Sequence, residues 1–467
     1  MDRILISAAH KSSGKTTVSI GLCAALQHRG LEVQPFKKGP DYIDPLWLGA
    51  ASARPCYNLD FNTQSDADIR TLFSTRAVGS DLCLVEANKG LYDGVARDGS
   101  DSNAALAKLL ALPVVLVIDV RGMTRGIAPL LLGYQQFDAA VRIGGVILNR
   151  TGGARHEGKL RQAVEYHTDL SVLGAVQDSP VLAIDERHLG LMPSNEHRDA
   201  ERQIVRIREL IAAQVDVGAV LQLARTADGT QQAAGSRIPQ GSARLRAVNN
   251  GSDVHIGICR DPAFGFYYPD DLDALQQAGA TLININTLRD TGLPPLDGLF
   301  IGGGFPETRL HELAANQALR TAIRSAIENG LPTYAECGGL MYLARSLSWK
   351  GERAEMAGVI PGDAVMYPRP QGRGYVELEP TSELPWPGAG VGLIRAHEFH
   401  YSRLENLAPG GRFAFRVRRG SGIDGEHDGW VCRNLLASYT HLRSTSRFDW
   451  ASRFVNFVRN YKRKTML

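Results

Sequence analysis

The chain has 467 residues, a formal net charge of +3, 44% hydrophobic residues and 22% charged residues. Its length is about three times that of one typical domain, so two or three separate cores are expected. The composition is that of a soluble globular protein, and so small a net charge argues against binding of nucleic acid. The six cysteines lack the paired spacing of a disulfide framework or a zinc site, as expected in a reducing compartment.

No segment is suited to export or to membrane insertion. No apolar run reaches the roughly 18 residues that span a bilayer. The N-terminal strand leads directly into a glycine-containing loop, without the charged and apolar regions of a cleavable signal. We therefore expect a cytoplasmic protein that does not enter the membrane.

Short β-branched runs alternate with helical stretches in both halves of the chain. The first half contains ILISAA, LCLVEA, PVVLVIDV, IGGVILN and SVLGAV, and the second half contains VHIGICRD, TLININT, GLFIGGG and LPTYAEC. This rhythm predicts α/β domains with mainly parallel sheets. Between them lies a polar stretch rich in Gly, Ser and Gln, which predicts a linker. The predicted organisation is a first domain over residues 1–225, a linker over 226–253 and a second domain over 254–467.

A glycine-containing loop, AAHKSSGKTT over residues 8–17, joins the first predicted strand to a helix. A standard P-loop has glycine where Ala9 stands, and Lys11 is an additional lysine. The strand–loop–helix context still predicts a phosphate cradle, because backbone N–H groups at the helix start can face phosphate oxygens. Lys15 would neutralise the terminal phosphates of ATP, and the Thr16 hydroxyl would bind Mg²⁺. The predicted nucleotide-binding residues are Lys11, Ser12, Ser13, Gly14, Lys15, Thr16 and Thr17.

Magnesium-dependent phosphoryl transfer also needs carboxylates, which KKGPDYIDP and VEANKGLYDG supply. Asp41 and Glu86 are predicted to join Thr16 as metal ligands and to act in catalysis. Glu86 ends a strand that should be buried, where a charge needs a cationic partner. Capping of a helix or pairing with an arginine is the alternative for Glu86. Asp44 remains without an assigned role.

Three further residues should lie at the same edge of the first sheet. Asp93 and Tyr42 are assigned to substrate placement or proton removal. Asn149 closes the strand GGVILN and would either read an adenine edge or form a turn.

YAECGG places Cys337 where a strand turns into a predicted helix, GGLMYLARSL. A helix N-terminus favours the thiolate, so Cys337 is a candidate nucleophile, although a buried core thiol is the alternative. Gly303 and Gly304 in IGGGFPE, together with Gly338, would supply backbone N–H groups to an oxyanion and bind substrate.

A nucleophilic cysteine also needs a general base. His441 in SYTHL follows an apolar strand-like run and is the first candidate. His397 and His400 in HEFHYS compete with it, and their roles stay open.

Many motifs in order along nearly the whole chain resemble those of cobyrinic acid a,c-diamide synthases: GKTT, KKGPDYIDP, NLD, VEANKGLYDG, ERHLGL, RDPAFGFYYPDDL, GGGFPE, YAECGGLMYL, GYVE, HEFHYS and ASYTHL. The resemblance implies a deviant P-loop amidoligase domain of the dethiobiotin-synthetase type, joined to a class I, triad-type glutaminase domain. It also implies that a Cys–His pair, Cys337 with His441, works without the usual acidic third member. Glu86 and Asp93 are implied on the synthetase side.

The implied reaction is amidation of acetate side chains on a tetrapyrrole, through an acyl phosphate made from ATP and ammonia released from glutamine. Relatives amidate cobyrinic or hydrogenobyrinic acid, nickel-sirohydrochlorin or sirohaem. HKSSGKTT and ANKG are similar to the sirohaem-amidating branch linked to sulfur oxidation. The expected partners are ATP, glutamine and a tetrapyrrole, and a homodimer is one candidate assembly. The alternatives are a binding ATPase of the partition or metallochaperone type and an amidotransferase for a non-tetrapyrrole acid.

Overall fold

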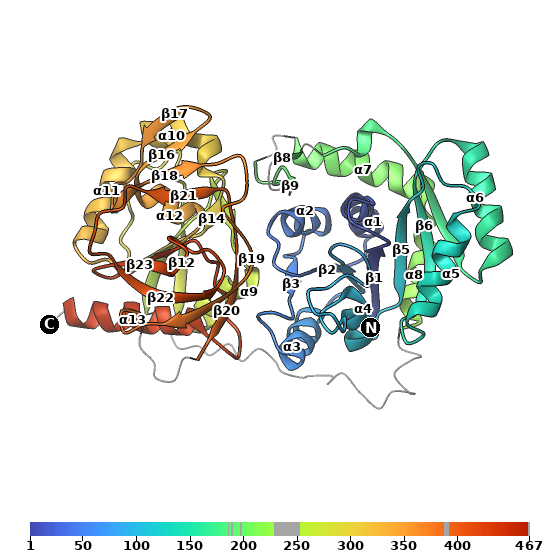
Figure 1. The fold of residues 1–467 in the computed structure, drawn as a ribbon, viewed down its shortest axis with the longest axis horizontal. Helices are drawn as coiled ribbons and strands as arrows, with labels where there is room; N and C mark the ends of the chain where they lie inside the picture. The colour runs from blue at the N-terminus through green and yellow to red at the C-terminus, as the bar shows by residue number, and fades with distance from the viewer. Residues whose placement is uncertain (185, 188–189, 197–198, 228–252, 387–391, 466–467) are drawn as a thin grey trace. The chain divides into compact units, whose positions relative to one another are not determined.

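The computed structural model describes residues 1–467 except 185, 188–189, 197–198, 228–252, 387–391 and 466–467. The chain forms two compact units, Met1–Arg244 and Leu245–Leu467, coloured blue to green and yellow to red in Figure 1. The predicted linker over residues 226–253 lies almost entirely outside the described residues, as do two residues of the ERHLGL motif.

The first unit is built on a seven-stranded parallel sheet in the order β3-β2-β4-β1-β5-β6-β7. The strands are β1 (Asp2–Ala8), β2 (Val33–Lys38), β3 (Tyr57–Leu59), β4 (Leu82–Glu86), β5 (Val114–Asp119), β6 (Ile143–Thr151) and β7 (Ser171–Gln177). Every residue of β2, β4 and β5 is buried, because helices cover both faces of the sheet. Burial on both faces explains why these strands appear in the sequence as continuous apolar runs rather than as alternating ones.

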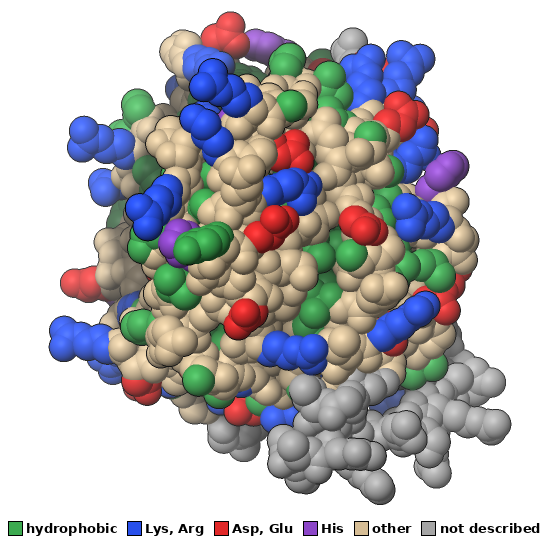
Figure 2. All heavy atoms as spheres, turned by 90° about the vertical axis from the view of Figure 1, so that its right-hand side faces the viewer, with side chains coloured by type: hydrophobic (Ala, Val, Ile, Leu, Met, Phe, Trp, Pro, Cys, Tyr) green, Lys and Arg blue, Asp and Glu red, His purple; other side chains and the backbone are tan. Residues whose placement is uncertain are grey.

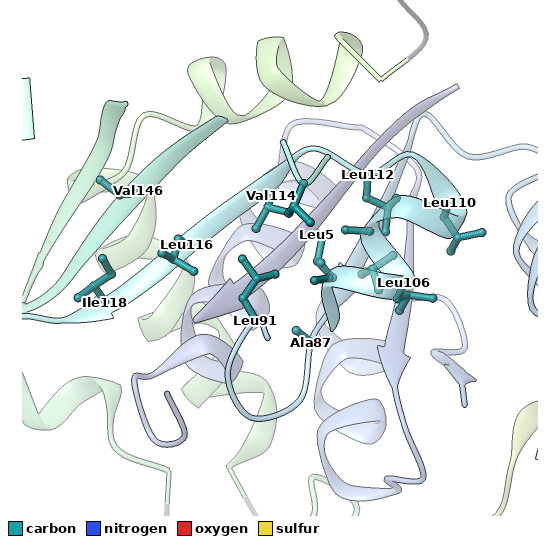
Figure 3. Close-up of a cluster of buried hydrophobic side chains, with 14 of the residues drawn as sticks. Leu5, Ala87, Leu91, Leu106, Leu110, Leu112, Val114, Leu116, Ile118 and Val146 are labelled. Carbon is teal, nitrogen blue, oxygen red and sulfur yellow. The ribbon is translucent and has the colours of Figure 1, made fainter. Parts of the chain in front are cut away.

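The crossover helices of this unit follow the strands in chain order. They are α1 (Lys15–His28), α2 (Ile43–Ser52), α3 (Asp66–Arg76), α4 (Asn103–Leu110), α5 (Ile127–Phe137), α6 (Ala154–His167), α7 (Ala200–Gln214) and α8 (Val217–Arg225), with a 3-10 turn Pro180–Leu182 and a hairpin of β8 (Glu186–Arg187) and β9 (Gly190–Leu191). In the core, Leu106 and Leu110 of α4 pack with Leu5 of β1 and Val114 of β5 (Figure 3).

The second unit has a nine-stranded sheet in the order β12-β10-β13-β15-β24-β23-β22-β19-β20. It is parallel from β12 to β24 and antiparallel from there to β20. The strands are β10 (Val254–Cys259), β12 (Ala280–Ile285), β13 (Gly298–Ile301), β15 (Thr333–Glu336), β19 (Gly372–Pro380), β20 (Ile394–His400), β22 (Arg412–Arg419), β23 (His427–Cys432) and β24 (Leu435–Ser438).

Two smaller sheets accompany the large one. The first pairs β11 (Phe264–Phe266) with β14 (Gly303–Gly304), and the second contains β16 (Ala344–Trp349), β17 (Glu352–Glu355), β18 (Ile360–Met366) and β21 (Ser402–Glu405). The helices of this unit are α9 (Pro269–Gln277), a 3-10 turn Pro306–Arg309, α10 (Leu310–Ala315), α11 (Gln317–Glu328), α12 (Gly338–Leu343) and α13 (Trp450–Thr465).

The side chains of successive β13 residues pack into two separate hydrophobic cores, one on each face of the large sheet. Leu299 and Ile301 pack with Ile323 of α11, whereas Phe300 packs with Phe454 of α13. This alternation follows from the two-residue period of a strand. The predicted α/β fold class is therefore confirmed for both units.

The predicted helix GGLMYLARSL is correct only in its first half. The helix ends at Leu343, and Ala344 begins a strand that pairs with Ile360 of β18. Apolar residues continue across this boundary, so the sequence period does not reveal it.

On the face drawn in Figure 2, Lys and Arg side chains are interspersed with Asp and Glu. Among the helices that the structure describes, none combines the length and the apolar character needed to cross a bilayer.

Candidate active sites

The phosphate loop leaves β1 at Ala8 and enters α1 at Lys15. Gly14 adopts a φ of +87°, and a Cβ atom there would lie 2.1 Å from Nδ2 of Asn149. The buried Ser13 hydroxyl donates to the carbonyl of His10 at 2.8 Å, which closes the loop on itself. Only glycine satisfies both the backbone angle and the close approach at position 14.

Asn149 is buried at the carboxyl end of β6. Its Nδ2 donates to the backbone carbonyl of Ser13 at 2.8 Å. The side-chain amide therefore holds the phosphate loop in place, a contact that the sequence did not predict.

The Thr16 hydroxyl lies among carboxylates from two other segments. Its Oγ1 is 2.6 Å from Oε1 of Glu86 and 3.3 Å from Oδ2 of Asp44. Glu86 is completely buried, and among the described residues its Oε2 has no hydrogen-bond partner. Hydroxyl and carboxylate oxygens are the ligands that Mg²⁺ prefers.

The structure places Asp44, rather than Asp41, against Thr16. Oδ1 of Asp41 accepts hydrogen bonds from the backbone N–H groups of Ile43 and Asp44, at 2.9 and 3.1 Å. Asp41 thus lies two residues before α2, and its side chain caps the first backbone N–H groups of that helix. The sequence assigned a metal-binding role to Asp41 and none to Asp44, because spacing alone does not say which aspartate turns toward the loop.

Lys37 is the residue of this site that the sequence analysis missed. Its Nζ lies 2.5 Å from Oδ2 of Asp44 and 3.0 Å from Oε1 of Glu86. Burial lowers the pKa of Lys37, but the charges of Asp44 and Glu86 outweigh this effect and hold the pKa above its usual value. Burial and the charge of Lys37 lower the pKa of Lys15. The available clue was a buried strand, VQPFKK, that ends in two lysines.

Thr16, Asp44 and Glu86 form a donor set that fits Mg²⁺ in a nucleotide site. Within the part of the chain that the structure describes, no three His, Cys, Asp or Glu side chains form a metal site by themselves. A P-loop magnesium site does not require this, because one or two carboxylates act together with a hydroxyl and the phosphates. The buried, unpartnered Oε2 of Glu86 supports the fit.

Asp93 and Tyr42 lie in the loops that follow β4 and β2. Asp93 is exposed, and its Oδ2 accepts a hydrogen bond from the backbone N–H of Gly90 at 2.9 Å. Tyr42 immediately precedes α2 and is 9% exposed. Both residues follow carboxyl ends of parallel strands, where α/β proteins bind ligands.

Cys337 lies at a sharp turn between β15 and α12. Its φ of +46° is rare for a residue with a side chain, and its side chain is almost buried. The backbone N–H of Cys337 donates to the carbonyl of Ser438 at 2.7 Å, which anchors the turn to the end of β24. A Cβ atom at Gly339 would lie 2.2 Å from the carbonyl oxygen of Ile301, so the turn is compatible only with glycine there.

His441 is the histidine that meets the cysteine. Cys337 and Glu336 are the residues whose interactions favour a charged His441, and Nδ1 of His441 lies 3.3 Å from Oε2 of Glu336. Burial opposes the charged imidazole, but the hydrogen bonds to Cys337 and Glu336 outweigh it and raise the pKa of His441 to about 10. The site therefore favours the charged imidazolium form of His441 beside Cys337, the candidate nucleophile.

Glu336 lies where an acidic partner of His441 would be expected, although the family resemblance implies that there is none. The resemblance implies a Cys–His pair without an acidic partner, yet the Glu336 carboxylate faces the His441 imidazole. Spacing did not reveal it, because Glu336 directly precedes Cys337 in the sequence, and neighbouring residues of a strand normally lie on opposite faces.

The glycines of IGGGFPE lie beside the cysteine turn. A Cβ atom at Gly303 would lie 2.6 Å from Cε1 of His441, and one at Gly338 would lie 3.0 Å from the backbone nitrogen of Gly304. Gly303 thus lies against the His441 ring, and Gly304 lies beside Gly338 at the cysteine turn. Backbone N–H groups in such a place are suited to an oxyanion.

The two competing histidines have other surroundings. The His397 ring stacks on His441 with centroids 5.0 Å apart, and burial and the charges of His441 and Arg443 lower the pKa of His397 well below its usual value. His400 stacks on Tyr439 at 4.0 Å and lies 3.5 Å from Glu398. His397 is therefore an uncharged ring packed against His441. His400 instead pairs with Glu398 in a separate buried contact.

Comparisons with known proteins agree with this geometry. Residues 4–191 match the model of the CobQ/CobB/MinD/ParA nucleotide binding domain, and residues 255–447 match that of the CobB/CobQ-like glutamine amidotransferase domain. A cobyrinate a,c-diamide synthase of Magnetococcus marinus is 44% identical over 98% of this chain and 97% of its own length. One from Archaeoglobus fulgidus is 40% identical over 97% of this chain and 96% of its own length.

Among solved structures, a glutamine amidotransferase from Thermotoga maritima is 13% identical and covers 46% of this chain and 86% of its own, with a TM-score of 0.30. That score is too low to bear on the reaction. The full-length relatives and the two domain matches show that the chain belongs to the cobyrinate a,c-diamide synthase family of glutamine-dependent ligases.

Proposed function

We propose that this protein amidates peripheral acetate carboxylates of cobyrinate, with ATP and glutamine as co-substrates. The observation that carries the proposal is Cys337 at a strained turn with His441 beside it, in a chain whose other unit has a phosphate loop with buried carboxylates. A binding ATPase has no use for such a cysteine. The relatives named cobyrinate a,c-diamide synthase support the choice of substrate.

In the first unit, a carboxylate of the substrate must become a better electrophile. An oxygen of the acetate would attack the γ-phosphorus of ATP, releasing ADP and leaving an acyl phosphate. Lys15 would neutralise the terminal phosphates, and Asn149 and Gly14 would keep the loop in shape. Thr16, Asp44 and Glu86 would hold Mg²⁺, which supplies positive charge to the phosphates. Asp93 and Tyr42 are assigned to placing the substrate.

In the second unit, His441 would take the thiol proton, and Sγ of Cys337 would attack the carboxamide carbon of glutamine. Backbone N–H groups of Gly304 and Gly338 would stabilise the resulting oxyanion. Return of the proton from His441 to the amide nitrogen releases ammonia and leaves a thioester, which water hydrolyses to glutamate. Ammonia then attacks the acyl phosphate and displaces inorganic phosphate.

Ammonia must reach the acyl phosphate before bulk water protonates it, since ammonium is not a nucleophile. The proposed chemistry therefore requires transfer along a sheltered route.

The substrate can be tested directly by mass spectrometry. The protein is incubated with ATP, glutamine, Mg²⁺ and, separately, cobyrinic acid, sirohydrochlorin or sirohaem. Conversion of two carboxylates of cobyrinic acid to amides is the expected result. Sirohaem is the second candidate, because HKSSGKTT and ANKG resemble that branch. No acid-to-amide conversion on any of the three would contradict the proposal and favour a non-tetrapyrrole acid.

Cys337→Ala tests the nitrogen source. This variant should lose glutamine hydrolysis and glutamine-dependent amidation, while an ammonium salt still supports amidation. Undiminished glutamine hydrolysis by Cys337→Ala would defeat the assignment of the nucleophile and leave the binding ATPase as the better explanation.

A further inference from the structure

We propose that Glu336 is a positioning residue of the glutaminase site, which orients His441 and stabilises its charged form from the strand residue directly before the nucleophile. This inference rests on the roles proposed above for Cys337 and His441. It supplies the acidic member that the family resemblance omits.

The contacts of Glu336 assign a separate function to each carboxylate oxygen. Oε1 accepts hydrogen bonds from the Tyr334 hydroxyl at 2.5 Å and from the backbone N–H of Leu442 at 2.9 Å. Oε2 remains for Nδ1 of His441 at 3.3 Å. The carboxylate is 3% exposed, so water does not compete strongly for these contacts. Nδ1 of His441 then carries the hydrogen, and Nε2 is the nitrogen that accepts the thiol proton of Cys337.

The turn at Cys337 explains how two adjacent residues reach one imidazole. Successive side chains of a strand lie on opposite faces, so Glu336 and Cys337 would diverge if β15 continued. The φ of +46° at Cys337 ends the strand and redirects the chain into α12. Both side chains can therefore meet His441. This histidine comes shortly after the end of β24, the strand that pairs with β15.

The charges around His441 favour the imidazolium. Cys337 and Glu336 contact the ring from β15 and its turn, and the neutral His397 stacks on it from β20. Among the nearby groups, burial and the charges of His441 and Arg443 lower the pKa of His397, and burial and the charges of Asp270 and Glu336 raise the pKa of Asp271. The Glu336 carboxylate is thus a negative group in contact with the ring, and its removal would take away that stabilisation of the imidazolium.

A purely structural role is the alternative, since Glu336 also binds the backbone N–H of Leu442. The two roles differ in what Glu336→Gln should do. The Leu442 N–H and the Tyr334 hydroxyl still require an acceptor, so the glutamine oxygen takes the place of Oε1 and its NH₂ group faces His441. That NH₂ group imposes the tautomer with hydrogen on Nε2, which cannot accept a proton from Cys337.

The first measurement is glutamine hydrolysis by the full-length protein. Glu336→Gln should lower kcat on the order of 10²- to 10⁴-fold with little change in KM, the scale seen when a triad histidine is held in the wrong tautomer. Tyr334→Phe is the matched control: it removes one donor to Oε1 but keeps the carboxylate on His441. Its kcat should stay within about tenfold of wild type.

The second measurement is the rate of Cys337 alkylation by iodoacetamide as a function of pH. With Glu336→Gln the rise in rate should move to higher pH, because the thiolate–imidazolium pair forms less readily, whereas Tyr334→Phe should keep the wild-type profile. Should Glu336→Gln fail to fold, judged by thermal unfolding, Glu336→Asp decides in the same assay. A shift to higher pH supports the proposal, and an unchanged profile overturns it.

An unchanged kcat and an unchanged alkylation profile in folded Glu336→Gln would also overturn the inference. The parent assignment fails in a different way, through retained glutamine hydrolysis by Cys337→Ala.

Discussion

The ammonium group of Lys37 lies 3.0 Å from the carboxylate of Glu86, and both side chains are shielded from solvent, with exposures of 3% and 0%. The register of β2 against β4 sets Lys37 directly beside Glu86. A buried carboxylate is costly without a cation, so this pair is required before any nucleotide arrives.

Lys37→Met should therefore destabilise the first unit strongly. Removal of one partner leaves Asp44 and Glu86 without their cation, and we expect a loss of about 3–5 kcal/mol in the free energy of unfolding, measured by urea denaturation. Lys108→Met is the control, because Lys108 pairs with Asp138 at 2.6 Å on the surface. It should cost at most about 1 kcal/mol. Equal losses in the two variants would refute the view that burial sets the strength of the Lys37 pair.

Asp44→Asn should weaken Mg²⁺-dependent use of ATP more than Asp41→Asn does. Asp44 faces the Thr16 hydroxyl, whereas Asp41 accepts backbone N–H groups at the start of α2, which an asparagine oxygen can also accept. We expect about a 10- to 100-fold increase in the Mg²⁺ concentration that half-saturates the reaction of Asp44→Asn, and a small change for Asp41→Asn. A magnesium titration of ATP consumption measures both, and the opposite ranking would restore the assignment made from the sequence.

Gly14→Ala should abolish productive ATP binding. A new Cβ atom would meet the Asn149 amide that holds the loop, and the φ of +87° is unfavourable for alanine. Gly30→Ala is a matched control, because Gly30 has a φ of +81° but no atom within 4 Å of a Cβ atom. It should cost only roughly 1–2 kcal/mol of stability from the backbone strain and leave the KM for ATP unchanged. ATP binding by calorimetry compares them, and normal affinity in Gly14→Ala would argue against the phosphate loop.

The sequence predicted those parts of the sites that lie within one local segment. The strand–loop–helix around Gly14 and the turn at Cys337 are local features, and their glycines and flanking apolar runs are visible in the sequence. The α/β fold class followed in the same way from alternating runs. The loop, the turn and the fold class are all determined by residues that are close together in the sequence.

The missed contacts depend on how separate strands align. Lys37 meets Glu86 through the β2–β4 register, and Glu336 meets His441 through a strained turn, so neither contact follows from spacing. The helix predicted from Gly338 stops at Leu343 because Ala344 finds a strand partner in Ile360. Tertiary pairing overrides local preference there.

The charged form of His441 should make stability depend on pH. Its pKa rises from the usual value of 6.5 to about 10 in the folded protein, so between these values the folded state binds more protons than the unfolded chain. The resulting stabilisation is complete below about pH 6.5 and is lost as the pH rises through about 10.

His441→Gln should accordingly be less stable than wild type at pH 6, and the difference should shrink toward pH 10. Urea denaturation at pH 6, 8 and 10 measures this difference. His311→Gln is the control, because His311 pairs with Glu352 on an exposed surface of the same unit and should give a small difference at every pH. A stability gap for His441→Gln that stays constant across this range would mean that packing of the ring, and not its charge beside Cys337 and Glu336, accounts for its contribution.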